Sequence, residues 1–295
     1  MKKYISFLLL LVFFLAPRVF AQTTVQGQFH PTVKHIPQTK TIETKSNTSF
    51  SFKDIKYWVG SGSNEAALMI EWHDGKSPDA IVWGFRWNGT ATGHDMIVAI
   101  AKADPRLLLL TQQTGPMGYT ICGLGYSDNK LNITYDLEGA KAHPEKNLFR
   151  FSEPFPTLSP QTSVPADPVG DAAAAIKNGL ATGVIYHPFT QAKYGYCSYD
   201  YDFWKCDAGS GHWAAGWYYG YWSYFTRESH TDEFFYSGVG STSRILNNGS
   251  WDAWSWNGDM TTMEGTTPGD IFVAATEPST TPTPSDPTDQ TIHDV

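Results

Sequence analysis

The sequence predicts an α+β fold, in which one main helix packs on a mixed, mostly antiparallel sheet. Several short stretches alternate apolar and polar residues between Gly, Pro and Asp turns, a pattern typical of strands. One stretch changes to helical spacing and opens with a helix-capping motif. Once the two polar ends are set aside, about 220 residues remain, which is enough for one large domain. A pure β-sandwich is the alternative, since predicted strands outnumber helices.

The N-terminal end has the parts of a secretory signal peptide. Lys2 and Lys3 precede an apolar run over 5–16, and the stretch 19–21 supplies a small–x–small cleavage site. We therefore predict residues 1–21 as a signal peptide and a mature protein that is secreted or held at the cell surface. A membrane anchor is the alternative, but the run is shorter than the roughly 20 apolar residues that a spanning helix needs.

Polar composition sets the other limits of the folded part. Residues 22–49 are polar, with scattered Thr, Gln and Lys, and are predicted to be a linker. Residues 274–295 form a Thr/Pro-rich tail with almost nothing apolar to bury, which is typical of disorder. A single ligand-binding domain is therefore predicted over 50–273. Nucleic acid is not expected as a partner, because a chain with a net charge of -8 lacks the electrostatic attraction to phosphates that usually drives such binding.

Three strands open the domain. Residues 52–59 and 67–72 read as the first two, and "AIVWGFRWNG" at 80–89 as the third. The Gly/Pro/Asp turn "DGKSPD" joins the second and third, which predicts a hairpin. Gly84, in the middle of the third strand, indicates a bulge or a close approach of another chain segment.

The main helix follows directly. Thr92 and Asp95 form a capping box with Asp in the usual Glu position, and Met96, Ile97 and Ile100 then recur at helical spacing on one face. Pro105 ends the helix. A short apolar run, "LLLLTQQT", and a strand, "YTICGLGYS", come next.

The second half is less regular. Residues 131–210 are predicted to be a long, loop-rich insertion, with one short helix that starts at Asp171. Strand patterning returns with "HWAAGWYYGYWSYFT" at 212–226, and an Asn-Asn-Gly turn precedes the last strand, "SWDAWSWN". Three cysteines are present; Cys197 and Cys206 are close enough in sequence for a disulfide in an exported protein, and Cys122 reads as a free core thiol.

Two motifs together carry a family resemblance. The first is "TATGHDMIVAIAKAD" directly after a strand, and the second is "GYWSYF" followed by "LNNGSWDAWSW". The pair is similar to the C-terminal, β-grasp-like domain of the transcobalamin and intrinsic-factor family, and the resemblance covers roughly 52–256. The chain also resembles uncharacterised secreted bacterial proteins that open with "WVGSGSNEAALMIEWHDG…VWGFRWNGTATG". In the transcobalamin family this domain caps one face of cobalamin, so the resemblance implies a corrinoid ligand.

The aromatic content raises the question of where so many rings go. The chain has 11 Trp and 15 Tyr. Trp83, Phe85 and Trp87 share one face of the third strand, where they either pack in the core or line a binding site. A lone sheet with one helix is not expected to bury all of these rings. The excess therefore predicts an aromatic binding surface, because Trp and Tyr offer large flat contacts with polar tips.

These observations predict an exported, non-enzymatic binding protein that captures a flat cofactor, cobalamin or another corrinoid. The alternative is a carbohydrate-binding or adhesive surface module; an outer-membrane uptake system is a candidate partner, and neither a resident cofactor nor a metal ligand set is expected. A hydrolase using Asp200 and Asp202 is a further alternative. The predicted ligand-binding residues are Trp222, Tyr224, Asn248, Ser250, Asp252, Trp254, Trp256 and His212.

Overall fold

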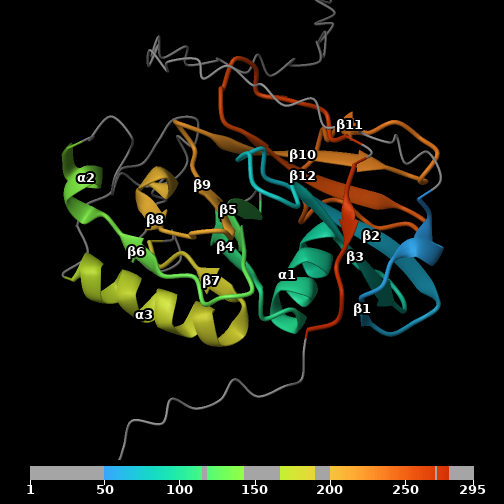
Figure 1. The fold of residues 1–295 in the computed structure, drawn as a ribbon, viewed down its shortest axis with the longest axis horizontal. Helices are drawn as coiled ribbons and strands as arrows, with labels where there is room; N and C mark the ends of the chain where they lie inside the picture. Colours follow the sequence, from blue (N-terminus) through green and yellow to red (C-terminus); the bar gives the residue numbers. More distant parts are fainter. Residues whose placement is uncertain (1–49, 115–117, 143–166, 190–199, 270, 279–295) are drawn as a thin grey trace, which may run out of the picture. The chain divides into compact units, whose positions relative to one another are not determined.

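The computed structural model describes residues 50–114, 118–142, 167–189, 200–269 and 271–278. Helices and strands are mixed, sheet dominates, and the sheets are open (Figure 1). This agrees with the predicted class at the level of mixed helix and sheet, and with the sandwich alternative. The predicted signal peptide and almost all of the linker and tail lie outside the described residues. Within those residues no helix has the length and apolar character needed to cross a membrane.

The largest sheet contains the predicted hairpin. Its strand order is β1-β3-β2-β12-β10-β11, with β13 also pairing with β3. Strands β2 and β3 are antiparallel, as predicted, and β12 runs parallel to β2 although it lies far away in sequence. The strands are β1 (Trp58–Gly60), β2 (Asn64–Glu71), β3 (Ala80–Trp87), β10 (Tyr221–Arg227), β11 (Phe235–Tyr236), β12 (Trp251–Asn257) and β13 (Val273–Ala274).

A second sheet has four strands in the order β7-β4-β5-β9, and a two-stranded sheet pairs β6 with β8. The strands are β4 (Leu107–Gln113), β5 (Tyr119–Tyr126), β6 (Ile133–Tyr135), β7 (Val184–Tyr186), β8 (Trp204–Cys206) and β9 (His212–Ala215). The helices are α1 (Gly93–Ala103), α2 (Leu137–Ala142) and α3 (Pro168–Thr182), with 3-10 turns at Phe52–Asp54 and Tyr201–Phe203.

Helix α1 begins where the sequence predicts. The Thr92 hydroxyl accepts from the Asp95 backbone N–H at 3.1 Å, and the Asp95 carboxylate accepts from the Thr92 N–H at 2.8 Å, so the capping box is formed. Met96, Ile97 and Ile100 are fully buried. The helix contacts β1 and β3 of the first sheet and β4 and β7 of the second, so its apolar face helps to join the two sheets (Figure 1).

Both faces of each main sheet are buried, and this explains the aromatic content. Alternate residues of β2 point into two different cores: Leu68 into the one around α1, and Met69 into one on the opposite face. The Leu107–Leu110 run of β4 divides in the same way between the α1 core and a third core beneath α3. A strand buried on both faces reads as a continuous apolar run.

None of the eleven tryptophans is exposed: seven are buried and four are intermediate. Trp83, Phe85 and Trp87 all belong to the core around α1. The premise that a lone sheet and one helix form the interior was wrong, since the described residues already form three cores.

Several element predictions need correction. The stretch 212–226 is two strands, β9 and β10, in different sheets, with a loop at 216–220 between them. Only the end of 52–59 is a strand, and α3 starts at Pro168, capped by Asp167, rather than at Asp171. These errors share a cause: aromatic and apolar runs do not show where a chain turns from one sheet to another.

The predicted insertion supplies part of the second sheet. Strand β7, inside 131–210, pairs in parallel with β4. Residues from this region, such as Ile133 and Ile185, cover the outward-facing Leu108 and Leu110.

The fold continues past the predicted C-terminal limit at 273. The Ala275 N–H donates to the Val82 carbonyl at 2.8 Å.

Another segment of the chain approaches Gly84 closely, as the sequence predicts. A Cβ at this position would overlap the indole of Trp58. The same indole stacks under the guanidinium of Arg86, 4.3 Å from the ring centre. Glycine is therefore needed in the middle of this strand because an aromatic ring crosses it, which is a packing requirement rather than a bulge.

Candidate functional site

The aromatic residues predicted to stack on a ligand lie in the interior. Trp222 is 0% exposed, and Tyr224 and Trp254 are 5% exposed. Tyr224 and Trp254 stack on each other, with ring centres 4.4 Å apart, and Trp222 contacts Trp256 at 5.3 Å. Trp256 is half-buried. Three of these four rings therefore have no face open to a ligand, because neighbouring side chains occupy their surfaces.

The predicted polar residues lie apart from one another in the fold, and among the described residues the Ser250 hydroxyl has no hydrogen-bond partner. The exposed Asn248 accepts from the Glu65 N–H at 2.8 Å and so fixes the turn before β12. Ser250 is fully buried beside it. His212 is 2% exposed, stacks on Trp72 at 4.6 Å, and directs Nδ1 to the Asp74 carboxylate at 3.1 Å. The structure thus spreads the predicted polar residues over separate structural tasks rather than gathering them around one ligand.

Asp252 lies at the centre of a buried polar network next to the start of α1. Its carboxylate accepts from the Tyr224 hydroxyl at 2.5 Å and from Arg244 Nε at 3.4 Å. Arg244 also donates to Glu228 at 2.6 Å. Burial raises the pKa of the Asp252 carboxyl to about 6, although the hydrogen bonds from Tyr224 and Arg244 act to lower it. A Cβ at Gly93 would overlap this pair, so the helix start packs directly on it.

The two carboxylates considered for glycoside hydrolysis are buried. Asp200 is 0% exposed; one oxygen lies 2.8 Å from His187 Nε2 and the other accepts from the Tyr135 hydroxyl at 2.5 Å. His187 Nδ1 accepts from the Phe189 N–H, which places the ring proton on Nε2. Asp202 is 4% exposed. Neither carboxylate is open to a sugar, so the pair does not form an acid–base site.

Asp202 instead fixes an aromatic loop, which we define as residues 216–220. Its carboxylate accepts the successive backbone N–H groups of Trp217, Tyr218 and Tyr219, at 3.1, 3.0 and 2.8 Å. Tyr219 is 47% exposed, and Trp217 and Tyr218 are half-buried. The expectation that some rings of this stretch point outward is therefore met in the aromatic loop, but not at the residues first assigned to the ligand.

The predicted disulfide stays a prediction. Cys206 has a free thiol in the structure, and Cys197 lies outside the described residues. Cys122 is buried in the core, as expected, and is not part of a disulfide.

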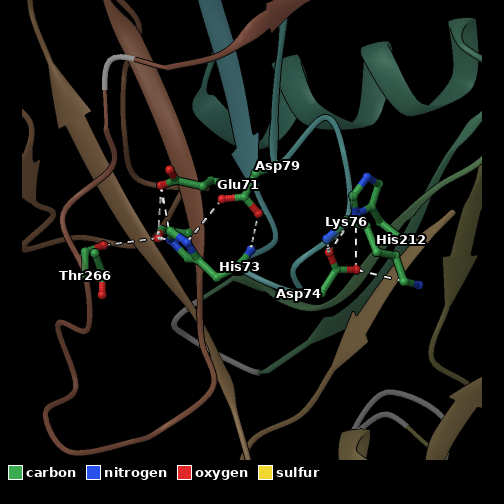
Figure 2. Close-up of polar contacts among 8 residues, drawn as sticks. Glu71, His73, Asp74, Lys76, Asp79, His212 and Thr266 are labelled. Atoms are coloured by element: carbon green, nitrogen blue, oxygen red, sulfur yellow. Dashed lines mark hydrogen bonds and ion pairs between the residues drawn. The ribbon is translucent and has the colours of Figure 1, made fainter. Parts of the chain in front are cut away.

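A different group of side chains converges at the loop of the β2–β3 hairpin. Glu71, His73 and Asp79 each place a possible metal-ligand atom within 4.8 Å of the other two (Figure 2). His73 Nε2 lies 3.2 Å from a Glu71 oxygen, and Nδ1 lies 3.5 Å from an Asp79 oxygen. We call these three residues the hairpin centre.

Contacts from β12 and within the hairpin loop hold the hairpin centre in place. Ser255 of β12 places its hydroxyl 3.0 Å from His73 Nε2 and donates to the Thr266 carbonyl at 3.1 Å. The Asp79 carboxylate accepts the His73 backbone N–H at 2.8 Å. His73 has φ 51, a left-handed conformation that is uncommon for a non-glycine residue and concentrates at functional sites.

Burial in the hairpin centre is graded. The side chain of Glu71 is 8% exposed, that of His73 29% and that of Asp79 45%, so the group opens to solvent on the Asp79 side. Hydrogen bonds to Asp79 and then Glu71 raise the pKa of His73 to about 10, against the opposing effect of burial. The same hydrogen bond lowers the pKa of Asp79. In the absence of a metal ion, a proton on His73 therefore balances the two carboxylates.

Other residues of the hairpin loop bind to the second sheet. Asp74 bonds His212 of β9, and Lys76 lies 3.7 Å from Asp74 while donating to the Gly211 carbonyl (Figure 2). One loop therefore contacts β12 through His73 and β9 through Asp74. This double attachment fixes the loop and limits how far the hairpin centre can rearrange.

Ser255, His73 and Asp79 lie together at the hairpin centre, but their geometry does not suit nucleophilic catalysis. Ser255 is 1% exposed and donates its proton to a carbonyl, so its oxygen is not presented to a substrate. A histidine with a pKa of about 10 is protonated at neutral pH and cannot act as a general base. Two carboxylates around one imidazole are instead a donor set for a divalent cation.

In the sequence Glu71 and His73 lie two residues apart, a spacing that places both on one face of an extended strand, but no third ligand stands at metal-site spacing from them. The third ligand is Asp79, at the other end of the hairpin loop. The predicted hairpin brings the two ends of its loop together, and the Trp72 N–H donates to the Asp79 carbonyl at 3.0 Å. The hairpin register pairs Glu71 with Ala80 and so sets Asp79 opposite Trp72; it does not by itself bring the Asp79 and His73 side chains together.

Comparisons of the chain with protein families, with curated proteins and with solved structures found no match. The resemblance to secreted bacterial proteins and to the transcobalamin domain therefore stays a prediction.

Proposed function

We propose that the protein is an exported, non-enzymatic binding protein whose hairpin centre binds a divalent transition-metal ion of the Zn²⁺ type. The observation that supports this most is the convergence of Glu71, His73 and Asp79 within 4.8 Å. Small side-chain adjustments bring such donors onto one ion, at the roughly 2.0–2.2 Å that Zn²⁺ requires from nitrogen and oxygen.

The donor types favour this ion over calcium. An imidazole at the centre of the group suits Zn²⁺ and its neighbours in the transition series, whereas Ca²⁺ takes six to eight oxygen ligands. The partial exposure of Asp79 and His73 gives an ion access from solvent, and Glu71 supplies a buried anchor. The Ser255 hydroxyl, which donates to the Thr266 carbonyl, contacts Nε2 of the imidazole and so helps to orient the ring.

Calorimetric titration of the full chain with ZnCl₂ tests this proposal. We expect one ion per chain, and an affinity that rises up to about tenfold per pH unit between pH 6 and 8, since the ion must displace the proton from His73. Titration in two buffers of different ionisation enthalpy then measures the release of that proton.

Matched variants locate the bound ion. Glu71→Gln, His73→Gln and Asp79→Asn preserve size, and each is expected to weaken binding by at least about 100-fold. Glu65→Gln is the control, since Glu65 pairs with Arg86 at 2.9 Å elsewhere on the hairpin. Zn²⁺ binding by the three variants that equals wild-type binding, or wild-type binding that is equal for Ca²⁺ and Zn²⁺, contradicts the proposal.

A second candidate function uses the aromatic loop to stack on a ring, either a corrin or a sugar. It is favoured by the exposed Tyr219 and by the three N–H groups that Asp202 holds, because a fixed loop loses little entropy on binding. The finer fold assignment, a β-grasp-like domain related to the transcobalamin C-terminal domain, belongs to this proposal. An outer-membrane uptake system is the partner that it implies for a corrinoid.

Titration with cyanocobalamin, read by its visible spectrum, and a glycan array test this second function. Stacking on Tyr219 predicts that Tyr219→Ala weakens binding of the positive ligand by about 5- to 100-fold, in line with about 1–3 kcal/mol per stacked ring. Tyr186→Ala, a comparably exposed tyrosine on β7, is the control. Failure of both ligand classes at about millimolar concentration, or full binding by Tyr219→Ala, ends this candidate.

A further inference from the structure

A groove of about 480 Å³ lies between strand β6 and helix α3, away from the hairpin centre. Helix α3 contributes Val169, Ala173, Ile176 and Leu180, which recur every three or four residues and therefore form one stripe along the helix. Ile133 of β6 forms part of the opposite wall. Figure 1 shows β6 and α3 as neighbouring elements. The volume falls within the roughly 300–1,000 Å³ of small-ligand sites.

The groove is an apolar surface that packing has left partly open. Ala172 and Gly179 are the buried residues of α3: Ala172 is 1% exposed, and a Cβ at Gly179 would overlap Ile185. Val169, in contrast, is 51% exposed although it is aliphatic. Ile176 and Leu180 of the stripe pack partly against the core beneath α3, so the groove continues that core toward the exposed Val169.

Two lysines accompany this apolar lining. Lys130 and Lys177 both line the groove, and within the described part of the chain neither forms an ion pair. In a protein of net charge -8, two cations that accompany one apolar groove favour a ligand with a negative group and an aliphatic body.

The shape of the lining narrows the class of ligand. From Val169 to Leu180 the stripe runs about 16 Å along the helix, at 1.5 Å per residue. Most of the lining is aliphatic and cannot satisfy the backbone groups of a peptide, which would be costly to bury there. An alkyl chain has no such groups. We propose that this groove binds a free long-chain carboxylate, with its alkyl chain along α3 and its carboxylate at Lys130 and Lys177.

Calorimetry with octanoate, decanoate and dodecanoate, each below its micelle concentration, tests the proposal on the full chain. Each added methylene is expected to tighten binding about fourfold, because burying one methylene group contributes about 0.8 kcal/mol. Dodecyltrimethylammonium, with the same tail and the opposite charge, is expected to bind at least tenfold more weakly than dodecanoate.

Variants separate the two parts of the site. The double variant Lys130→Gln/Lys177→Gln is expected to lose at least tenfold in dodecanoate affinity and to keep the dependence on chain length. Val169→Asp, at an exposed position that does not threaten the fold, is expected to abolish binding. Lys102→Gln, on the exposed side of α1, is the control. No binding at about 1 mM dodecanoate, equal binding of the cationic analogue, or unchanged affinity in the double variant overturns the proposal.

Discussion

Replacing Trp222 with alanine is expected to lower the free energy of unfolding by about 3–5 kcal/mol, the cost of removing a fully buried large aromatic side chain. Trp222 is 0% exposed, and its Nε1 donates to the Ala214 carbonyl at 3.0 Å. Its ring contacts Trp72 and Trp256, so the substitution opens a cavity where the two sheets meet. Urea titration of wild type and variant, with circular dichroism as the signal, measures the effect.

Tyr219→Ala provides the matched comparison for Trp222→Ala. Tyr219 lies in the same aromatic stretch but is 47% exposed, so its truncation is expected to change stability by less than about 1 kcal/mol. Equal losses in the two variants would mean that the aromatic loop belongs to the core. A loss below about 1 kcal/mol for Trp222→Ala would mean that this tryptophan is not a packing residue, and would return it to the candidate ligand contacts.

Stability is expected to fall as pH rises from 4 to 6 because of Asp252. Burial raises the pKa of this carboxyl to about 6, whereas an unfolded chain protonates it near its ordinary value of 3.8. Between these two values the native state holds a proton that the unfolded state has released, so raising the pH favours unfolding. The difference amounts to at most about 3 kcal/mol, at 1.36 kcal/mol per pH unit.

Asp252→Asn isolates this contribution, because asparagine keeps an oxygen for Tyr224 and Arg244 but does not titrate. The free energy of unfolding of wild type minus that of the variant is expected to fall between pH 4 and 6 and to be constant above pH 7. Urea titrations at fixed pH values give this difference. A difference that stays constant across the range, or rises with pH, contradicts the assignment of a raised pKa to Asp252.

Local signals in the sequence predicted the elements that depend on neighbouring residues. The hairpin of β2 and β3 follows from two apolar strands around a Gly/Pro turn, and the start of α1 follows from the capping pair Thr92 and Asp95. The requirement for Gly84 was also visible, although the Trp58 ring that imposes it was not.

The candidate site was harder to predict because its members come from separate elements. Glu71 and His73 lie two residues apart, but Asp79 joins them only when the hairpin loop folds back, and Ser255 only when β12 pairs with β2. The prediction from the aromatic residues was wrong for a related reason. Their number indicated an aromatic binding surface, but their burial depends on how many layers cover each sheet.

The sequence by itself determined the mixed class of the fold, the hairpin, the capped helix and the large quantity of aromatic surface, since each of these rests on short-range periodicity and composition. Only the tertiary structure decided where that surface lies. Parallel pairing of β12 with β2 and of β7 with β4 joins segments far apart in the chain, and this pairing buries both faces of the two sheets. Burial is a property of layers, and no local pattern specifies which distant segment forms the next layer.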